Sequence, residues 1–438
     1  MPVPEFRDER RGEEILAVFA TAFGGLPAGR AAVGARFRAM AASPLAFHRG
    51  SACLSSHDLA ADPEGGRYLD ERTSRGWIHG DLHAGNFGAR LDGTGRLVFQ
   101  ATGLDDAYVG PFTWDLKRFV ASLALLGHAR ALSDARIADV VRGYAHAYRE
   151  RVHALATGAE GHETAAPTTE TARGPLLDTL LSARSRTRSA LLDSLTEVRG
   201  AERRFRPCDD TVELDAATRY KVLAAFDGYL ETLPDTSLSR PDAYRVKDVV
   251  GRRHSAEDEP STHHLLVEGG SDALEHDVVV EIRRIGPPAV ARHLAEPALD
   301  AHFAHEGHRA VVARRALMPY ADPWLGWTEL DGEGRLVREV SPYAVDLDWD
   351  RVMEPSEVAD VAADLGRVTA TTHAASAVPA DGSVVPFPTG RAIDAAIAAD
   401  EDGFAPLLVD HARASAERAL EDHRIFVDLL RRGMIPGL

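Results

Sequence analysis

The residues best suited to chemistry lie in one short segment, His79-Gly80-Asp81-Leu82-His83-Ala84-Gly85-Asn86. Asp81 and Asn86 are five positions apart, and a strand-like segment follows directly. Phosphoryl transfer requires a carboxylate that orients and deprotonates the acceptor hydroxyl, and oxygen ligands that hold Mg²⁺ against the phosphates. In this spacing Asp81 supplies the base and Asn86 a metal ligand. An ordinary polar turn is the alternative, but the long motif favours a catalytic loop.

The histidines and the next acidic segment extend this prediction. His79 is expected to hold the loop through hydrogen bonds, and His83 is a second acid–base candidate. Asp105 and Asp106 are candidates for a second metal-binding carboxylate, because a strand expected at 96–100 ends just before them. Of the two we expect Asp105 to bind the metal. Asp115, at the start of a helix, can accept backbone N–H groups and fix the loop.

Hydrophobic spacing predicts the elements that position these residues. Helical periodicity covers 13–42, 113–127 and 133–155, and helix dominates again from 356 to the end. Residues 45–50 are expected to form a short strand, 87–100 a hairpin, and 243–350 several strands. The low-complexity stretch 156–174 is predicted to be a flexible loop. The class is therefore α+β.

These elements predict a division into lobes. We expect a large helical lobe with the catalytic loop over 1–240, a smaller strand-rich lobe over 241–350, and a C-terminal helical segment over 351–438 that packs on the first lobe.

Composition and charge limit the kinds of partner that we expect this protein to bind. A net charge of -17 argues against nucleic acid, which is bound by clustered Lys and Arg. No apolar run approaches the roughly 20 residues of a membrane span, and the charged start lacks the apolar segment of a signal peptide. Two cysteines, Cys53 and Cys208, cannot form a disulfide framework. We expect a cytoplasmic protein whose partner is a small molecule, and the helices show no sustained heptad pattern that would define an oligomer.

The chain also resembles a known family. Residues 43–50, 79–88, 105–122, 307–327 and 411–423 are similar to blocks of the bacterial domain-of-unknown-function family 2252. That family looks like a relative of the aminoglycoside phosphotransferases and protein kinases. The resemblance implies a two-lobed, protein-kinase-like fold with Mg²⁺ and ATP (or GTP) as cofactors. Because the nucleotide-lobe signals follow the catalytic loop, it also implies a permuted order.

Three features that this resemblance implies are altered. A Gly-rich phosphate loop is expected at 251–260, but that stretch has one glycine and three acids, and the acids would repel phosphates. Arg283 stands where a strand lysine should contact the phosphates. The family's Asp-Phe-Asp segment reads Gly103-Leu104-Asp105, so a metal ligand at Gly103 would be lost while Asp105 remains.

Two further groups are candidates. Arg49 precedes Gly50 in a turn and could present its guanidinium to an anion, or form a structural salt bridge to Asp58. His302, His305 and His308 are spaced to share one helix face, but a zinc site needs further ligands, and a polar helix face is the simpler interpretation.

The sequence therefore predicts a small-molecule-modifying enzyme. The first hypothesis is phosphoryl transfer from a nucleoside triphosphate to a hydroxyl or amine, with Asp81 as base, Asn86 and Asp105 as Mg²⁺ ligands, and Arg283 contacting phosphate. The second is a lyase, isomerase or cyclase that uses Asp81 and His83 without a nucleotide. The third is a non-catalytic pseudokinase that acts as a binding module.

Overall fold

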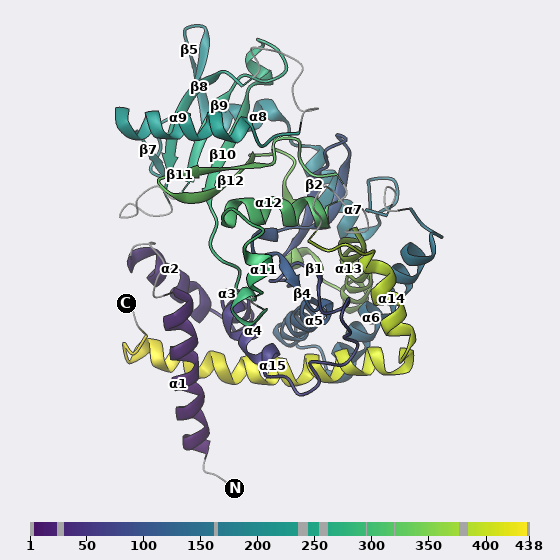
Figure 1. The fold of residues 1–438 in the computed structure, drawn as a ribbon. Helices are drawn as coiled ribbons and strands as arrows, with labels where there is room; N and C mark the ends of the chain where they lie inside the picture. The colour runs from purple at the N-terminus through teal and green to yellow at the C-terminus, as the bar shows by residue number, and fades with distance from the viewer. Residues whose placement is uncertain are drawn as a thin grey trace.

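The computed structural model describes residues 4–23, 30–161, 165–234, 244–253, 262–294, 296–318, 320–375 and 384–435. Figure 1 shows a strand-rich lobe above a larger helical lobe, with the C-terminal helix crossing the base of the view. Every strand pair in the described residues is antiparallel, which confirms the predicted mixture of helices and strands. Among these helices none is long and apolar enough to cross a membrane.

The first part of the chain builds most of the helical lobe. Its elements are α1 (Pro4–Phe23), α2 (Arg30–Ala41), α3 (Pro44–Gly50), α4 (Ala52–Ala60), β1 (Gly76–Ile78), β2 (Phe87–Leu91), β3 (Leu97–Ala101), η1 (Leu104–Asp106), β4 (Tyr108–Gly110), α5 (Phe112–Ala129), α6 (Asp134–Thr157) and α7 (Gly174–Arg184). The last part completes it with β13 (Val345–Asp346), η5 (Trp349–Arg351), α13 (Pro355–Ala374), α14 (Thr389–Ala398) and α15 (Glu401–Arg431).

The middle of the chain builds the strand-rich lobe. Its elements are α8 (Arg188–Leu195), β5 (Thr196–Arg199), β6 (Glu202–Phe205), β7 (Thr211–Val212), α9 (Ala216–Leu230), β8 (Val246–Arg252), β9 (Thr262–Val267), η4 (Leu274–His276), β10 (Val278–Arg284), α12 (Glu306–Leu317), β11 (Gly326–Leu330) and β12 (Glu333–Glu339). Between β10 and α12 the chain forms α10 (Ala291–Leu294) and α11 (Pro297–Asp300), which pack on β1 and β4 of the helical lobe. Six strands form one sheet in the order β11-β12-β10-β9-β8-β7.

The helical lobe has one large core, in which α5, α6 and α13 pack together. Leu116, Phe119, Tyr144 and Leu365 are fully buried there. Helix α5 runs through the middle of this core, because every residue from Phe112 to Gly127 is buried. Strands β2 and β3 lie against the same core through Phe87 and other side chains. This core therefore supports the hairpin that follows the predicted catalytic loop.

Alternation along the strands gives the six-stranded sheet two different faces. The outer face carries Val278, Val280 and Ile282 and is covered by α9. The cleft face carries Val279, Glu281 and Arg283 on β10, and Leu336 on the same face packs on α12. The charged positions of β10 thus point toward the helical lobe.

Local predictions had mixed outcomes. The hairpin at 87–100 is confirmed, and so are the helices at 113–127 and 133–155. The strand expected at 45–50 is wrong, since these residues form α3. Ser43 accepts the N–H of Ala46 and Pro44 occupies the first helical turn, which together start a helix.

Two segments are predicted to be loops, and the structure describes each of them only in part. In 156–174, Ala165 and Ala172 are buried, and Phe99 N–H donates to the Pro167 carbonyl at 2.8 Å. These residues are therefore packed against β3, while 162–164 lie outside the described residues. Most of the altered phosphate-loop segment, 254–260, also lies outside them.

A buried ion pair joins the beginnings of β8 and β10. Lys247 Nζ lies 2.6 Å from Asp277 Oδ1, and both side chains are almost completely buried. Burial raises the pKa of Asp277 even though Lys247 opposes that rise. Each charge is therefore stable at this buried position only while the other is present.

We predict that Lys247→Met lowers the free energy of unfolding by about 3–5 kcal/mol, because it leaves Asp277 buried without a partner. The double variant Lys247→Met/Asp277→Leu should recover most of that loss, since no charge is then left buried. Urea unfolding followed by circular dichroism measures both. A single variant as stable as the wild type would contradict this role.

Candidate functional site

The predicted catalytic loop is held by one buried carboxylate. Asp115 on α5 accepts the His79 N–H at 2.6 Å and the Gly80 N–H at 2.9 Å. On its other side His373 Nε2 of α13 lies 3.0 Å from Asp115 Oδ2. The role predicted for Asp115, fixing the loop through backbone N–H groups, is confirmed. The loop therefore takes its shape from the helical core.

Gly80 is required by a close backbone approach. Its φ is +79°, a conformation that favours glycine, and a Cβ there would lie 2.0 Å from the carbonyl oxygen of Asp106. The loop and η1 are thus in direct contact.

The Asp81 carboxylate projects from the loop, and a buried arginine holds one of its two oxygens. Arg118 Nε donates to Asp81 Oδ1 at 2.7 Å, and Arg118 Nη2 contacts the same oxygen. Arg118 is itself held by Ser55 Oγ at 2.6 Å and the His48 carbonyl at 3.1 Å. Asp81 Oδ2 accepts no hydrogen bond from the described residues. One oxygen is therefore fixed and the other is free for a substrate proton.

Asn86 lies beside Asp81, as its spacing predicted. Its Nδ2 donates to the Asp81 carbonyl at 2.8 Å, which turns the amide oxygen toward Gly103. A Cβ built on Gly103 would lie 3.2 Å from Asn86 Oδ1. A side chain at position 103 would start close to the Asn86 amide, but the chain has glycine there, and its φ of +74° favours glycine.

Asp105 does not fill this gap. Arg283 of β10 donates to both of its oxygens, at 2.7 and 2.9 Å, and Arg314 of α12 forms a second ion pair. Burial acts to raise the pKa of Asp105, but Arg314 and Arg283 outweigh it and hold the pKa well below its ordinary value. Asp105 is therefore ion-paired with two arginines of the strand-rich lobe.

Asp106 faces the loop in a different setting. Its Oδ1 accepts the Ala289 N–H at 3.2 Å. Burial and the nearby charge of Asp81 raise the pKa of Asp106 to about 6. Asp81 and Asp106 are thus neighbouring carboxylates with different surroundings.

The two loop histidines have structural contacts. His79 is fully buried, with Nε2 donating to the Thr102 carbonyl at 2.7 Å and Nδ1 accepting the Asp81 N–H at 3.3 Å. His83 Nδ1 accepts the Gly85 N–H at 3.1 Å. Burial, followed by the charges of Arg118 and Arg49, lowers the pKa of His83 to about 2. His83 is therefore neutral near pH 7 and carries no proton to donate as an imidazolium.

Arg49 lies against the loop. A Cβ on Gly85 would be 3.1 Å from its guanidinium carbon, so glycine makes room for this side chain. The alternative partner, Asp58, is bound by both terminal nitrogens of Arg11. The geometry therefore agrees with a positive charge presented beside the catalytic loop.

Two cavities lie near these residues, although neither Asp81 nor Asn86 lines either of them. The cleft cavity, of about 210 Å³, lies between the lobes and is lined by Thr102, Gly103, Glu281, Arg314, Arg338 and Val340, among others. The helical cavity, of about 580 Å³, lies among α3, α4, α5 and α15 and includes Phe47, Leu54, Lys117, Arg118, Leu407 and His411. Arg118 joins the helical cavity to Asp81.

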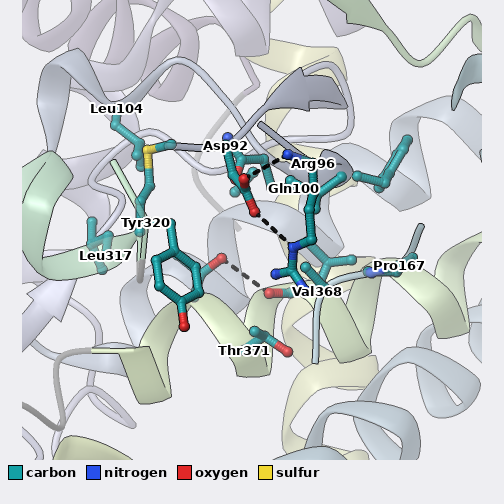
Figure 2. Close-up of a pocket in the computed structure, with 15 residues that line it drawn as sticks. Asp92, Arg96, Gln100, Leu104, Pro167, Leu317, Tyr320, Val368 and Thr371 are labelled. Carbon is teal, nitrogen blue, oxygen red and sulfur yellow. Dashed lines mark hydrogen bonds and ion pairs between the residues drawn. The ribbon is translucent and has the colours of Figure 1, made fainter. Parts of the chain in front are cut away.

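A third, much smaller cavity of about 40 Å³ adjoins the cleft cavity, because Gln100, Ala101, Leu104 and Met318 line both. Figure 2 shows Asp92 bound to Arg96 at its rim and Val368 and Thr371 of α13 on its wall. None of the predicted catalytic residues lines it. It is a gap in packing and adds no group to the site.

The three histidines at the start of α12 have other contacts in the structure. His305 is the N-cap of α12, with Nδ1 accepting the His308 N–H, and His308 lies against the ring of Trp327 at 4.4 Å. Across the described ranges, no three His, Cys, Asp or Glu side chains are grouped to hold a metal. The simpler interpretation, a polar helix end, fits this geometry.

Three arginines near the loop could not be assigned a role from the sequence. Arg118 follows Asp115 by three positions on the buried helix α5, and Lys117-Arg118 is a charged pair in an apolar segment, which is a signal that could have found it. Arg314 and Arg309 of α12 had no such signal. Arg309 Nη2 donates to the Asp105 carbonyl at 2.8 Å and Nη1 to the Ala107 carbonyl at 2.5 Å. These two arginines join α12 to η1.

We predict that Asp115→Asn lowers the free energy of unfolding by about 2–3 kcal/mol, because an amide would point N–H groups at the backbone N–H groups of the loop. Asp227→Asn, at an exposed position of α9, should leave stability unchanged. Thermal and urea unfolding of the three proteins checks this. Equal losses in both variants would rule out a specific clamp.

His83 gives the protein a predicted acid sensitivity. Its pKa is about 2 when folded and about 6.5 in an unfolded chain, so between pH 6 and 4 the unfolded state binds one more proton. The free energy of unfolding should therefore fall as pH falls, by up to about 1.4 kcal/mol per pH unit from this group. His83→Asn, which retains an acceptor for Gly85, should flatten that slope in urea titrations. An unchanged slope would contradict the burial of a neutral His83.

Comparison with known proteins places this site in a family. No curated protein and no solved structure matches the chain. A family model described as "Uncharacterized protein conserved in bacteria (DUF2252)" matches residues 30–429, which includes the catalytic loop, η1 and both cavities. The chain therefore belongs to the bacterial family DUF2252.

Proposed function

We propose that this protein is a small-molecule-modifying enzyme with a kinase-like, permuted, two-lobed fold. The support is the order of its parts. An antiparallel sheet packs against α12, which lies between β10 and β11 in the chain, and a short connection from β12 leads back to the helical lobe with its His-x-Asp-x-x-x-x-Asn loop. The strand-rich lobe follows that loop in sequence, which is a permuted order.

The proposed reaction is phosphoryl transfer to a hydroxyl or amine. The observation that carries it is the setting of Asp81, with one oxygen fixed by the buried Arg118 and the other turned to no protein donor in the described residues. A general base must be oriented in this way to accept a substrate proton. Asp81 takes that proton through Oδ2, and Arg118 keeps the carboxylate in place as it does so.

The acceptor molecule binds in the helical cavity. This cavity is of the size typical for small-molecule sites, and it combines apolar side chains with charged ones. Lys117 and Arg118 form part of its wall, with Lys117 Nζ held by Asp62 at 2.5 Å. A bound hydroxyl or amine would enter from this side toward Asp81.

The phosphate donor is assigned to the cleft cavity. Arg314 lines it and Arg283 lies beside it, and arginine is well suited to phosphate oxygens. In the conformation described, the residues do not fit a bound Mg²⁺–nucleotide. Position 103 lacks a carboxylate facing Asn86, and Asp105 is taken up by two arginines.

That disagreement favours one second candidate, nucleotide-independent acid–base chemistry at Asp81. The specific observation is Gly103, which faces Asn86 where a metal-binding carboxylate would be needed. Turnover of a substrate in chelator-treated buffer without nucleotide would support this candidate, and strict dependence on ATP would remove it.

Replacement of the proposed base tests the function. We predict that Asp81→Asn lowers turnover about 100-fold or more, because a general base is removed while the loop hydrogen bonds remain. The measurement is ADP release and ³¹P NMR with Mg-ATP and pooled alcohols and amines. Asp178→Asn, an exposed acid of α7, is the control and should retain full activity. An Asp81→Asn variant with full turnover would reject Asp81 as the base.

A further inference from the structure

Three serines lie in and just before α4, and two of them use their hydroxyl protons within the chain's own helical turns. Ser51 Oγ donates to the carbonyl four residues back at 2.7 Å, and Ser56 Oγ donates to the carbonyl three residues back at 3.0 Å. Ser55 differs from both. Its Oγ accepts Arg118 Nη1 at 2.6 Å and donates to no acceptor in the described part of the chain. Because a hydroxyl has one proton and two lone pairs, Ser55 keeps its proton and one lone pair available.

Ser55 connects the helical cavity to the proposed base. It is partly buried and lines that cavity together with Arg118. Arg118 binds Ser55 through Nη1 and Asp81 through Nε and Nη2, and these three nitrogens lie in one rigid plane. One guanidinium therefore holds both Ser55 and the Asp81 carboxylate. Since Asp81 itself does not line the cavity, Ser55 is the cavity-facing side of this arrangement.

The bonding capacity of Ser55 indicates which acceptor suits it. An alcohol oxygen has lone pairs and can accept the free Ser55 proton. An alkyl amine carries an ammonium charge near pH 7 and offers no lone pair. It could bind only to the remaining lone pair of Ser55, whose oxygen already accepts from the Arg118 cation. Two positive groups would then converge on one oxygen, so the site favours the alcohol.

The acids that line the helical cavity are either ion-paired or exposed. Three of them have an arginine or lysine partner: Asp58, Asp62 and Asp422. The other two, Glu64 and Asp410, are exposed, so water and salt screen their charges. Among the described residues that line this cavity, no buried acid is thus left to bind an ammonium group.

We propose that Ser55 is a specificity-determining residue that donates its hydroxyl proton to the oxygen of an alcohol in the helical cavity, so that alcohols and not amines are the acceptors. This inference rests on the proposed phosphoryl transfer and narrows its acceptor to one class. With its oxygen bound by Ser55, the alcohol turns its own proton toward Asp81 Oδ2. The alcohol oxygen forms the new bond to phosphorus while the bond from phosphorus to the leaving oxygen of the donor breaks, and Asp81 takes the alcohol proton.

Matched pairs of acceptors test this assignment in the wild-type protein. Alcohols and amines of the same linear, cyclic and aromatic carbon skeletons are compared with Mg-ATP as donor, by ADP release and ³¹P NMR. The alcohols should have a kcat/KM at least about tenfold above that of the matching amines. Equal or better turnover of the amines would overturn the role of Ser55 and leave phosphoryl transfer standing. Absence of turnover with both classes would overturn the two proposals together.

Variants at position 55 separate recognition of the acceptor from support of Arg118. Ser55→Ala should raise KM for alcohols about tenfold with little change in kcat, because one hydrogen bond to the acceptor is lost. Ser55→Thr keeps a hydroxyl and should restore KM. Ser56→Ala, a neighbouring serine that does not line the cavity, is the matched control and should retain the wild-type KM. A lower kcat with unchanged KM in Ser55→Ala would restrict Ser55 to holding Arg118 and overturn the proposal. Should Ser55→Ala fail to fold, the wild-type comparison of alcohols with amines decides.

Discussion

The site depends on a single buried carboxylate. Asp115 is almost inaccessible to water, so its charge must be satisfied by the protein, and it is satisfied by two loop N–H groups and by His373. His373 in turn is hydrogen-bonded to Tyr148 through Nδ1. The loop is thus connected to α5, α6 and α13 at once, and its geometry follows from the packing of these helices. For this reason the packing of the three helices sets the position of Asp81.

Arginines then divide the acids of the site into two kinds. Arg118 holds one oxygen of Asp81 and leaves the other available, whereas Arg283 and Arg314 together engage both oxygens of Asp105. The same kind of ion pair therefore has different results: one oxygen of Asp81 accepts no hydrogen bond from the described residues, whereas both oxygens of Asp105 are bound by arginine. The difference arises from burial and from how many cations converge on each acid.

The two sides of the site differ accordingly. The helical cavity is the larger of the two and is connected to Asp81 through Arg118, while the cleft side carries the ion pairs of Asp105 with Arg283 and Arg314. In the proposed reaction, acceptor and donor would therefore bind on different sides of Asp81.

The sequence by itself determined the features that are local. The spacing of Asp81 and Asn86, the hairpin after them and the long helices α5 and α6 could be predicted because periodicity and spacing are properties of neighbouring residues. Tertiary structure decided the rest. Segment 45–50 became helical because Ser43 and Pro44 start a helix there. The ion pairs of Asp105 could not be predicted, because Arg283 and Arg314 are far away in the chain and meet it only in the folded structure. Such partners come together only when distant parts of the chain are buried against each other, so a pattern of neighbouring residues does not predict them.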